Sequence, residues 1–186
     1  KAIARIRESD EKKEEKDWQD HVVIIGFGIN GENVAKAAHR ARIPYVVVEI
    51  DPMVMQAAKA KGEPVVFGDA TNESILKHVH VQNARVIVIA ISASQATRQI
   101  IQTIRMFSAT SHIIVRTRYV KEIEDLTLIG ADEVIPEEFE TSVEIFTRVL
   151  KKYLVPNDEI EAFVNEIREG NYEVFRSLSG VETGDR

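Results

Sequence analysis

The sequence predicts an α/β protein built on a doubly wound parallel sheet of six strands, and three observations lead to this prediction. Short apolar runs alternate six times with helix-forming segments along residues 21–136. The apolar runs are continuous, which is typical of parallel strands covered by helices on both faces. The connections are short, so right-handed crossovers favour the strand order 3-2-1-4-5-6.

Each predicted strand is rich in β-branched residues, and each predicted helix has recognisable ends. The six strands are expected at 21–28, 44–51, 64–69, 84–91, 112–118 and 131–136. The intervening helices are expected at 30–42, 52–62, 71–81, 94–109 and 120–130. Pro44 stops the first helix, and Pro52 and Gly62 bound the second. Thr71 or Asn72 is expected to cap the third.

The alternation stops after Pro136. Residues 137–154 place apolar side chains at close to helical spacing, and 157–170 form a second amphipathic segment after Pro156. The predicted organisation is a charged linker over 1–20, a nucleotide-binding domain over 21–136, dimerisation and crossover helices over 137–170, and a tail over 171–186. Two amphipathic helices that follow a complete sheet need a surface to pack against, and a partner subunit is one candidate.

Composition narrows the function classes. Of the 186 residues, 44% are hydrophobic and 29% are charged, which is typical of a globular domain. The net charge of −6 argues against nucleic acid as a partner. The sequence has no cysteine, so thiol chemistry and cysteine-ligated zinc are excluded. No apolar run approaches the roughly 20 residues that span a bilayer.

The motif with the clearest chemistry is G-x-G-x-x-G at Gly26, Gly28 and Gly31, between the first strand and the first helix. The first glycine permits a tight turn, the second lets a pyrophosphate approach the backbone, and the third lets helix and strand pack closely. The helix N-terminus then offers N–H groups to a phosphate. This context predicts a Rossmann-like dinucleotide site.

An acidic residue at the end of the second strand is expected to bind the ribose. Glu49 lies about 20 residues beyond the glycines, the usual position for a carboxylate that takes both ribose hydroxyls. Asp51 is the alternative, although its place before Pro52 also suits a helix N-cap. A carboxylate here repels a 2′-phosphate, so NADP is disfavoured.

Three further strand ends face the same crevice. Gly68 permits a turn after the third strand, where Asp69 either binds the adenine amino group or a ribose hydroxyl or forms a local cap. After the fourth strand, Ser92 or Ser94 is expected to cap the next helix, and either is compatible with ligand contact. Arg116 and Arg118 end the fifth strand and either meet a phosphate or form a surface pair.

Nothing in the sequence supplies an obvious proton donor for hydride transfer, and the short connections leave no room for a substrate site. His78 and His80 have poor spacing for a metal site, and no metal is expected. These features argue against a stand-alone NAD-dependent oxidoreductase, which is kept as the alternative to a domain that binds the nucleotide without reacting with it. An assembly module that binds no nucleotide is the third hypothesis.

In combination, the segments "VVIIGFGINGENVAKAA", "VVVEIDP", "VVFGDAT", "HIIVRTR" and "GADEVIPEE" resemble the RCK domain, also called KTN or TrkA-N. The resemblance covers about residues 20–150, and the segments after Glu138 look most like the Kef-type branch of potassium/proton antiporters. The resemblance implies a cytoplasmic, nucleotide-binding regulator of potassium transport that is not an enzyme. A potassium-channel gating subunit is an alternative within the family.

The resemblance also implies the partners. Residues 1–20 would link the domain to a membrane transport domain, on the cytoplasmic side of the cell membrane. Homodimers would form through the helices after strands 5 and 6, with 157–169 as a crossover helix.

The motif and the resemblance together define the expected nucleotide site. It comprises Gly26, Phe27, Gly28, Ile29, Asn30, Gly31, Glu49, Ile50, Asp51, Gly68, Asp69, Ala70, Thr71, Ser92 and Arg116. Many relatives carry arginine at the position of Ile29, where it contacts a terminal phosphate. Its absence favours AMP or NAD(H) as the adenine nucleotide, with ATP and ADP still possible.

Overall fold

The computed structural model describes residues 18–170 and Tyr172. The predicted linker over 1–20 and tail over 171–186 therefore fall outside the described residues, except for 18–20 and Tyr172. Six strands form one parallel sheet in the order β3-β2-β1-β4-β5-β6, which confirms the predicted fold class. The strands are β1 (His21–Ile25), β2 (Tyr45–Glu49), β3 (Val65–Phe67), β4 (Ala84–Ile89), β5 (His112–Thr117) and β6 (Glu133–Pro136).

Helices connect successive strands, close to the predicted positions. They are α2 (Ile29–Ala41), α3 (Pro52–Ala60), α4 (Glu73–His78), α5 (Ser94–Phe107) and α6 (Ile123–Leu128), with α7 (Glu137–Lys152) and α8 (Asn157–Glu169) after the sheet. Two short 3-10 turns, Val81–Asn83 and Val120–Glu122, were not predicted. No helix within the described residues is both long and apolar enough to cross a membrane.

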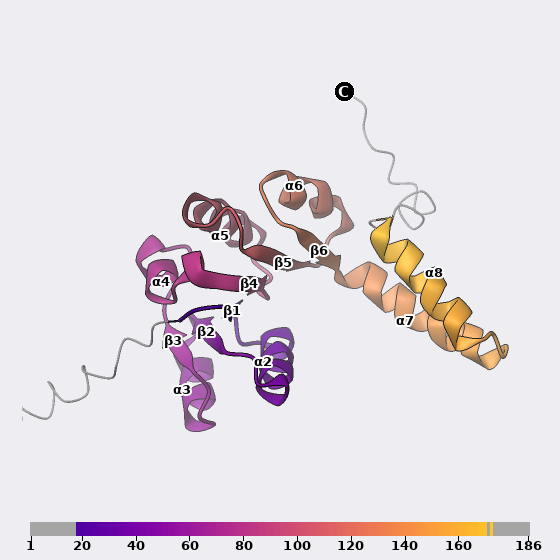
Figure 1. Cartoon of the computed structure of the whole chain (residues 1–186), viewed down its shortest axis with the longest axis horizontal. Coiled ribbons are helices and arrows are strands. Elements are labelled where there is room, and N and C mark those ends of the chain that lie inside the picture. The colour runs from indigo at the N-terminus through magenta and orange to yellow at the C-terminus, as the bar shows by residue number, and fades with distance from the viewer. Residues whose placement is uncertain (1–17, 171, 173–186) are drawn as a thin grey trace, which may run out of the picture.

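The sheet separates two hydrophobic cores. The larger core lies under α4, α5 and α6, and the smaller lies under α2 and α3 on the opposite face (Figure 1). Fully buried side chains of the larger core include Leu76, Ile100, Ile104, Ile123 and Leu126. Small residues of α2 and α3, such as Ala35 and Ala58, let these helices pack closely on the sheet.

The second face is covered only in part by the described helices. Here α2 and α3 pack mainly against β1, β2 and β3. Val86, Val88 and Ile114 alternate with the core residues of β4 and β5, so they point to this face, and they are only partly buried. The continuous apolar runs of β4 and β5 predicted that helices cover both faces of these strands, but the described helices cover this face of β4 and β5 only in part.

The parallel register brings the ends of the strands to one edge. Ile25 at the end of β1 pairs with Val48 and with Ile89, and Glu49 pairs with Phe67. Because all the strands run the same way, the loops that follow them open at one edge of the sheet. This edge is where the candidate site lies.

Helices α7 and α8 form a hairpin that extends from the β6 end of the sheet (Figure 1). The rings of Phe146 and Phe163 lie 5.3 Å apart, and Arg168 pairs with both carboxylate oxygens of Glu140, at 3.0 and 2.6 Å. Part of each apolar stripe is thereby buried within the chain. Ile145, Val149, Tyr153 and Leu154 remain exposed.

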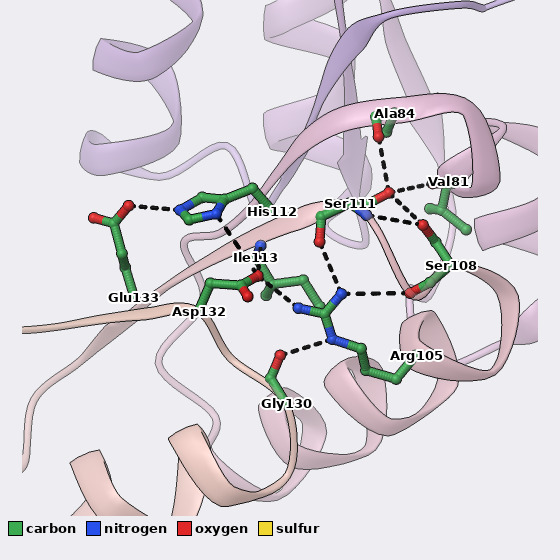
Figure 2. A network of polar contacts seen from close by, with 10 residues as sticks. All are labelled: Val81, Ala84, Arg105, Ser108, Ser111, His112, Ile113, Gly130, Asp132 and Glu133. Atoms are coloured by element: carbon green, nitrogen blue, oxygen red, sulfur yellow. Dashed lines mark hydrogen bonds and ion pairs between the residues drawn. The ribbon is translucent and has the colours of Figure 1, made fainter.

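At the amino ends of the strands, opposite the carboxyl ends where the candidate site lies, a polar network holds the start of β5. Figure 2 shows Arg105 of α5 at its centre, donating to the carbonyls of Gly130 and Ser111 at 2.8 Å and to Asp132 at 2.6 Å. Asp132 also accepts the backbone N–H of Ile113 at 2.6 Å. The network ties α5 to the segment between α6 and β6, far along the strands from the glycine loop.

His21 at the start of β1 makes stability depend on pH. The ring is buried, its Nε2 lies 2.9 Å from the Val79 carbonyl, and its Nδ1 has no partner among the described residues. Burial, with the charge of His80, lowers the pKa of His21 below its usual 6.5. The unfolded chain thus binds the proton more readily than the folded one. The contribution of neutral His21 to the free energy of unfolding is therefore fully present above about pH 6.5 and is lost as the pH falls below that value.

We expect His21→Gln to lose less stability than the parent between pH 7.5 and 5.0, measured by urea unfolding at each pH. His39→Gln removes an exposed histidine and serves as the matched control. Parallel pH profiles for the parent and His21→Gln would contradict this role.

Candidate functional site

The glycine loop has the geometry that its three glycines predict. Gly26 has φ +93°, and its N–H donates to the Val48 carbonyl at 2.8 Å, which fastens the loop to β2. A Cβ at Gly31 would lie 1.9 Å from the carbonyl oxygen of Gly26, so only glycine fits between loop and helix. A Cβ at Gly28 would meet no atom within 4 Å, which leaves the backbone there open to a ligand.

The N-terminus of α2 follows directly. Its N-cap is Gly28, which has no side chain to occupy the first N–H groups, and Glu32 makes the first intrahelical bond back to Gly28 at 2.9 Å. The side chain of Ile29 is 82% exposed beside this terminus. Free N–H groups and the helix dipole make such a terminus suitable for an anion.

Glu49 is buried, and it holds the glycine loop. Its Oε2 accepts the N–H of Phe27 at 2.6 Å, and its Oε1 accepts the N–H of Asp51 at 2.8 Å. The carboxylate thus joins the end of β2 to the loop after β1, a structural contact that the ribose prediction did not include. Each carboxylate oxygen has a second lone pair for another donor.

Asp51 is the N-cap of α3. Its Oδ1 accepts the N–H groups of Met53 at 2.8 Å and Val54 at 3.2 Å, which confirms the capping alternative. Asp51 lines neither of the two cavities described next, whereas Glu49 lines both. Of the two candidate acids, the structure brings Glu49 into the crevice.

Two adjoining cavities lie along the carboxyl edge of the sheet. The β3-side cavity has a volume of about 290 Å³ and is lined by Ile25, Gly26, Val48, Glu49, Ile50, Gly68, Asp69, Ala70, Thr71, Ile91, Ser92, Ala93, Ala96 and Ile100. The β5-side cavity has about 480 Å³ and is lined by Gly26, Gly28, Ile29, Asn30, Glu49, Ala90, Ile91, Ser92, Arg116 and Glu137. Gly26, Glu49, Ile91 and Ser92 line both, so the cavities form one crevice.

Twelve of the fifteen predicted site residues line this crevice. The other three, Phe27, Gly31 and Asp51, line neither cavity. Phe27 packs its ring into the smaller core, so only its backbone contributes through the bond to Glu49. Gly31 acts by packing and Asp51 by capping.

The turn after β3 is organised by Asp69. Its Oδ1 accepts both the N–H and the hydroxyl of Thr71 at 2.8 Å, so the local-cap alternative is confirmed. Asp69 still lines the β3-side cavity. At the end of β4, the expected cap is wrong: the N-cap of α5 is Ala93, and neither Ser92 nor Ser94 caps the helix.

Arg116 projects from β5 into the β5-side cavity but is paired there. Its Nε donates to Oε1 of Glu137 at 2.5 Å, and Nδ2 of Asn30 lies 3.4 Å from the same oxygen. The hydrogen bond from Arg116 holds the pKa of Glu137 below its usual range. Arg118 lies beyond the strand and adds a weaker attraction to Glu137.

The predicted site did not include Ile91 or Glu137, nor six further lining residues: Ile25, Val48, Ala90, Ala93, Ala96 and Ile100. Ile91 contributes to both cavities, but an apolar residue at the end of an apolar run carries no distinct signal. Glu137 is 107 positions from Asn30, and only the fold brings them together. The indirect signal was the predicted strand order. It brings the ends of β1, β5 and β6 to one edge of the sheet, and α7 begins directly after β6.

Comparison with known proteins agrees with this geometry. The family model of the TrkA-N domain matches residues 22–137. A putative K(+) efflux antiporter KefB of Alkalimonas amylolytica is 32% identical over 158 residues, which is 85% of this chain and 24% of that protein. This chain thus spans about a quarter of that relative's length.

Two solved structures share the fold. The Kef C-terminal domain of Shewanella denitrificans in an AMP-bound form superposes with a TM-score of 0.67 at 18% identity, covering 83% of this chain and 96% of that one. The GsuK channel bound to NAD gives a TM-score of 0.61 at 22% identity, covering 82% of this chain and 27% of that one. Because the family model matches more than half of the chain, this chain belongs to the TrkA-N domain family.

Proposed function

We propose that this chain binds AMP or NAD(H) and, as a cytoplasmic nucleotide-sensing domain, gates a potassium/proton antiporter by a ligand-dependent rearrangement of a homodimer. The observation that carries the proposal is the crevice formed by the two adjoining cavities, with the open backbone at Gly28 and the buried Glu49. The family and the KefB relative support the transport context.

The crevice suits a nucleotide from end to end. The β3-side cavity offers apolar walls from Ile50, Ile91 and Ile100 for a base, with Asp69 at its rim. Glu49 lies between the two cavities, where a ribose joins base and phosphate. Gly28 and the N-terminus of α2 lie at the β5-side cavity, where the phosphate would bind.

AMP and NAD(H) are favoured over ADP and ATP. Ile29 offers no charge to a terminal phosphate, and the Arg116 guanidinium is already paired with Glu137. Proteins with this fold have been solved with AMP, with NAD and with ADP, so the preference rests on Ile29 and on the Arg116–Glu137 pair of this chain.

The Arg116–Glu137 pair also supports a ligand-dependent rearrangement, because Glu137 is the first residue of α7. The exposed apolar residues of α7, which include Ile145 and Val149, are available for a second copy of the chain. A change at the crevice would thus reach the dimer surface through one helix, provided that the ligand favours one arrangement.

Thermal unfolding with AMP, ADP, ATP, NAD, NADH and NADPH tests the proposal. A ligand at 100 times its Kd stabilises by about 2.7 kcal/mol, which raises Tm by roughly 5–10 °C for a domain of this size. We expect shifts with AMP, NAD or NADH and none with NADPH, whose 2′-phosphate meets Glu49. Turnover of NADH with a reducible substrate would indicate an oxidoreductase in place of a sensor. An unchanged Tm with every nucleotide would contradict the proposal.

A further inference from the structure

In the β5-side cavity, the guanidinium of Arg116 is paired with the side-chain carboxylate of Glu137. Glu137 Oε1 lies 2.5 Å from Nε of Arg116, and both side chains line the cavity. The Arg116 side chain is 17% exposed and that of Glu137 is 39% exposed. The arginine is thus held inside the cavity while its partner still reaches solvent, so the carboxylate has room to move away.

The pair lies where a nucleotide would continue beyond its first phosphate. The strand order places Glu49, the glycine loop and Arg116 in succession along the crevice. Asn30, in the first turn of α2, lies 3.4 Å from Glu137 Oε1, so the carboxylate borders the helix terminus itself. A phosphate bound beyond the first one at α2 would lie against Glu137.

Charge then decides which ligands fit. The charged side chains lining the β5-side cavity are Glu49, Arg116 and Glu137, which sum to −1. The hydrogen bond from Arg116, with its positive charge, holds the pKa of Glu137 below its ordinary value, so the carboxylate stays ionised at neutral pH. A terminal phosphate would have to displace the Glu137 carboxylate from Arg116, and the two negative charges would then remain close together.

We propose that Glu137 sets the ligand specificity of this crevice by pairing with Arg116, so that AMP, which ends at the first phosphate, binds better than nucleotides such as ADP that carry a second, terminal phosphate. This inference rests on the proposed function and deepens it. Glu137, the first residue of α7, thus competes with a terminal second phosphate such as that of ADP, whereas the second phosphate of NAD(H) is a diester with a single charge and is repelled less.

Isothermal titration of the whole chain with AMP and ADP, in the presence of a chelator, tests the inference. The chelator is needed because a divalent cation bridges carboxylate and phosphate. Two like charges a few ångströms apart near a protein surface repel strongly enough to change affinity about tenfold. We expect Glu137→Gln to raise ADP affinity about tenfold while AMP affinity changes less than threefold.

The matched control is Glu138→Gln, which removes the same charge from the neighbouring position. Glu138 is exposed and lies outside the lining of the cavity. Adding Arg116→Gln to Glu137→Gln should erase the gain for ADP, because the freed guanidinium causes it. Equal changes for AMP and ADP, or a gain that persists without Arg116, would overturn the inference. If the parent bound neither AMP nor NAD(H), the proposed function itself would be contradicted.

Discussion

Gly31→Ala is expected to lower the free energy of unfolding by more than about 4 kcal/mol, a cost seen only with severe packing or backbone conflicts. The added Cβ would lie 1.9 Å from the carbonyl oxygen of Gly26. That carbonyl belongs to a residue with φ +93° whose N–H is bonded to β2, so it cannot move aside cheaply. Urea unfolding followed by circular dichroism measures the loss. A variant within 1 kcal/mol of the parent would show that the helix shifts freely.

Gly28→Ala is the matched comparison, and we expect it to weaken AMP binding while leaving stability nearly unchanged. Its Cβ meets no atom within 4 Å, and its φ of −71° suits any residue, so stability should fall by no more than about 1 kcal/mol. The methyl group occupies the space through which a phosphate approaches the backbone, so AMP affinity should fall at least tenfold. Two alanine substitutions three positions apart thus separate packing from ligand approach.

The glycine pattern was predictable because its causes are local. A turn, an open backbone and a close helix contact each need glycine at a fixed distance from the end of β1, whatever the rest of the chain does. The strand order was predictable for a related reason, since apolar runs alternating with short helices leave few allowed topologies.

The helix cap after β4 shows where local reasoning stops. The segment Ser92-Ala93-Ser94 offers two hydroxyls near the start of α5, and the cap position falls on the alanine between them. Sequence pattern does not fix a boundary to one residue when several capping residues are adjacent. The neighbouring N-cap of α3 at Asp51 was predicted because Pro52 fixes the first turn.

Glu137 was missed because its role depends on tertiary structure. In the sequence it begins an acidic, amphipathic helix, and acidic residues in a first turn are common for reasons of helix stability alone. Only the placement of α7 beside the end of β5 brings its carboxylate to Arg116 and Asn30. Glu49 was predicted, but its hydrogen bond to the glycine loop was not, because it joins residues 22 positions apart.

Glu49→Gln is expected to weaken AMP binding at least tenfold and to lower stability by about 2 kcal/mol. The buried carboxylate accepts two backbone N–H groups, whereas glutamine has one acceptor oxygen and would turn an N–H₂ group toward the other donor. Titration with AMP and urea unfolding measure the two effects. Asp51→Ala is the control, because it removes a cap worth about 1 kcal/mol outside the cavities and should leave AMP affinity within threefold.

Comparison of AMP with 2′-deoxy-AMP separates direct contact from support of the loop. If Glu49 accepts a ribose hydroxyl, the parent should prefer AMP about tenfold, and Glu49→Gln should reduce this preference severalfold. If Glu49 acts only through the N–H of Phe27, both ligands should weaken together and their ratio should stay the same. The buried carboxylate has lone pairs for both tasks, and a reduced ratio would show that one side chain both shapes the glycine loop and recognises the ligand held against it.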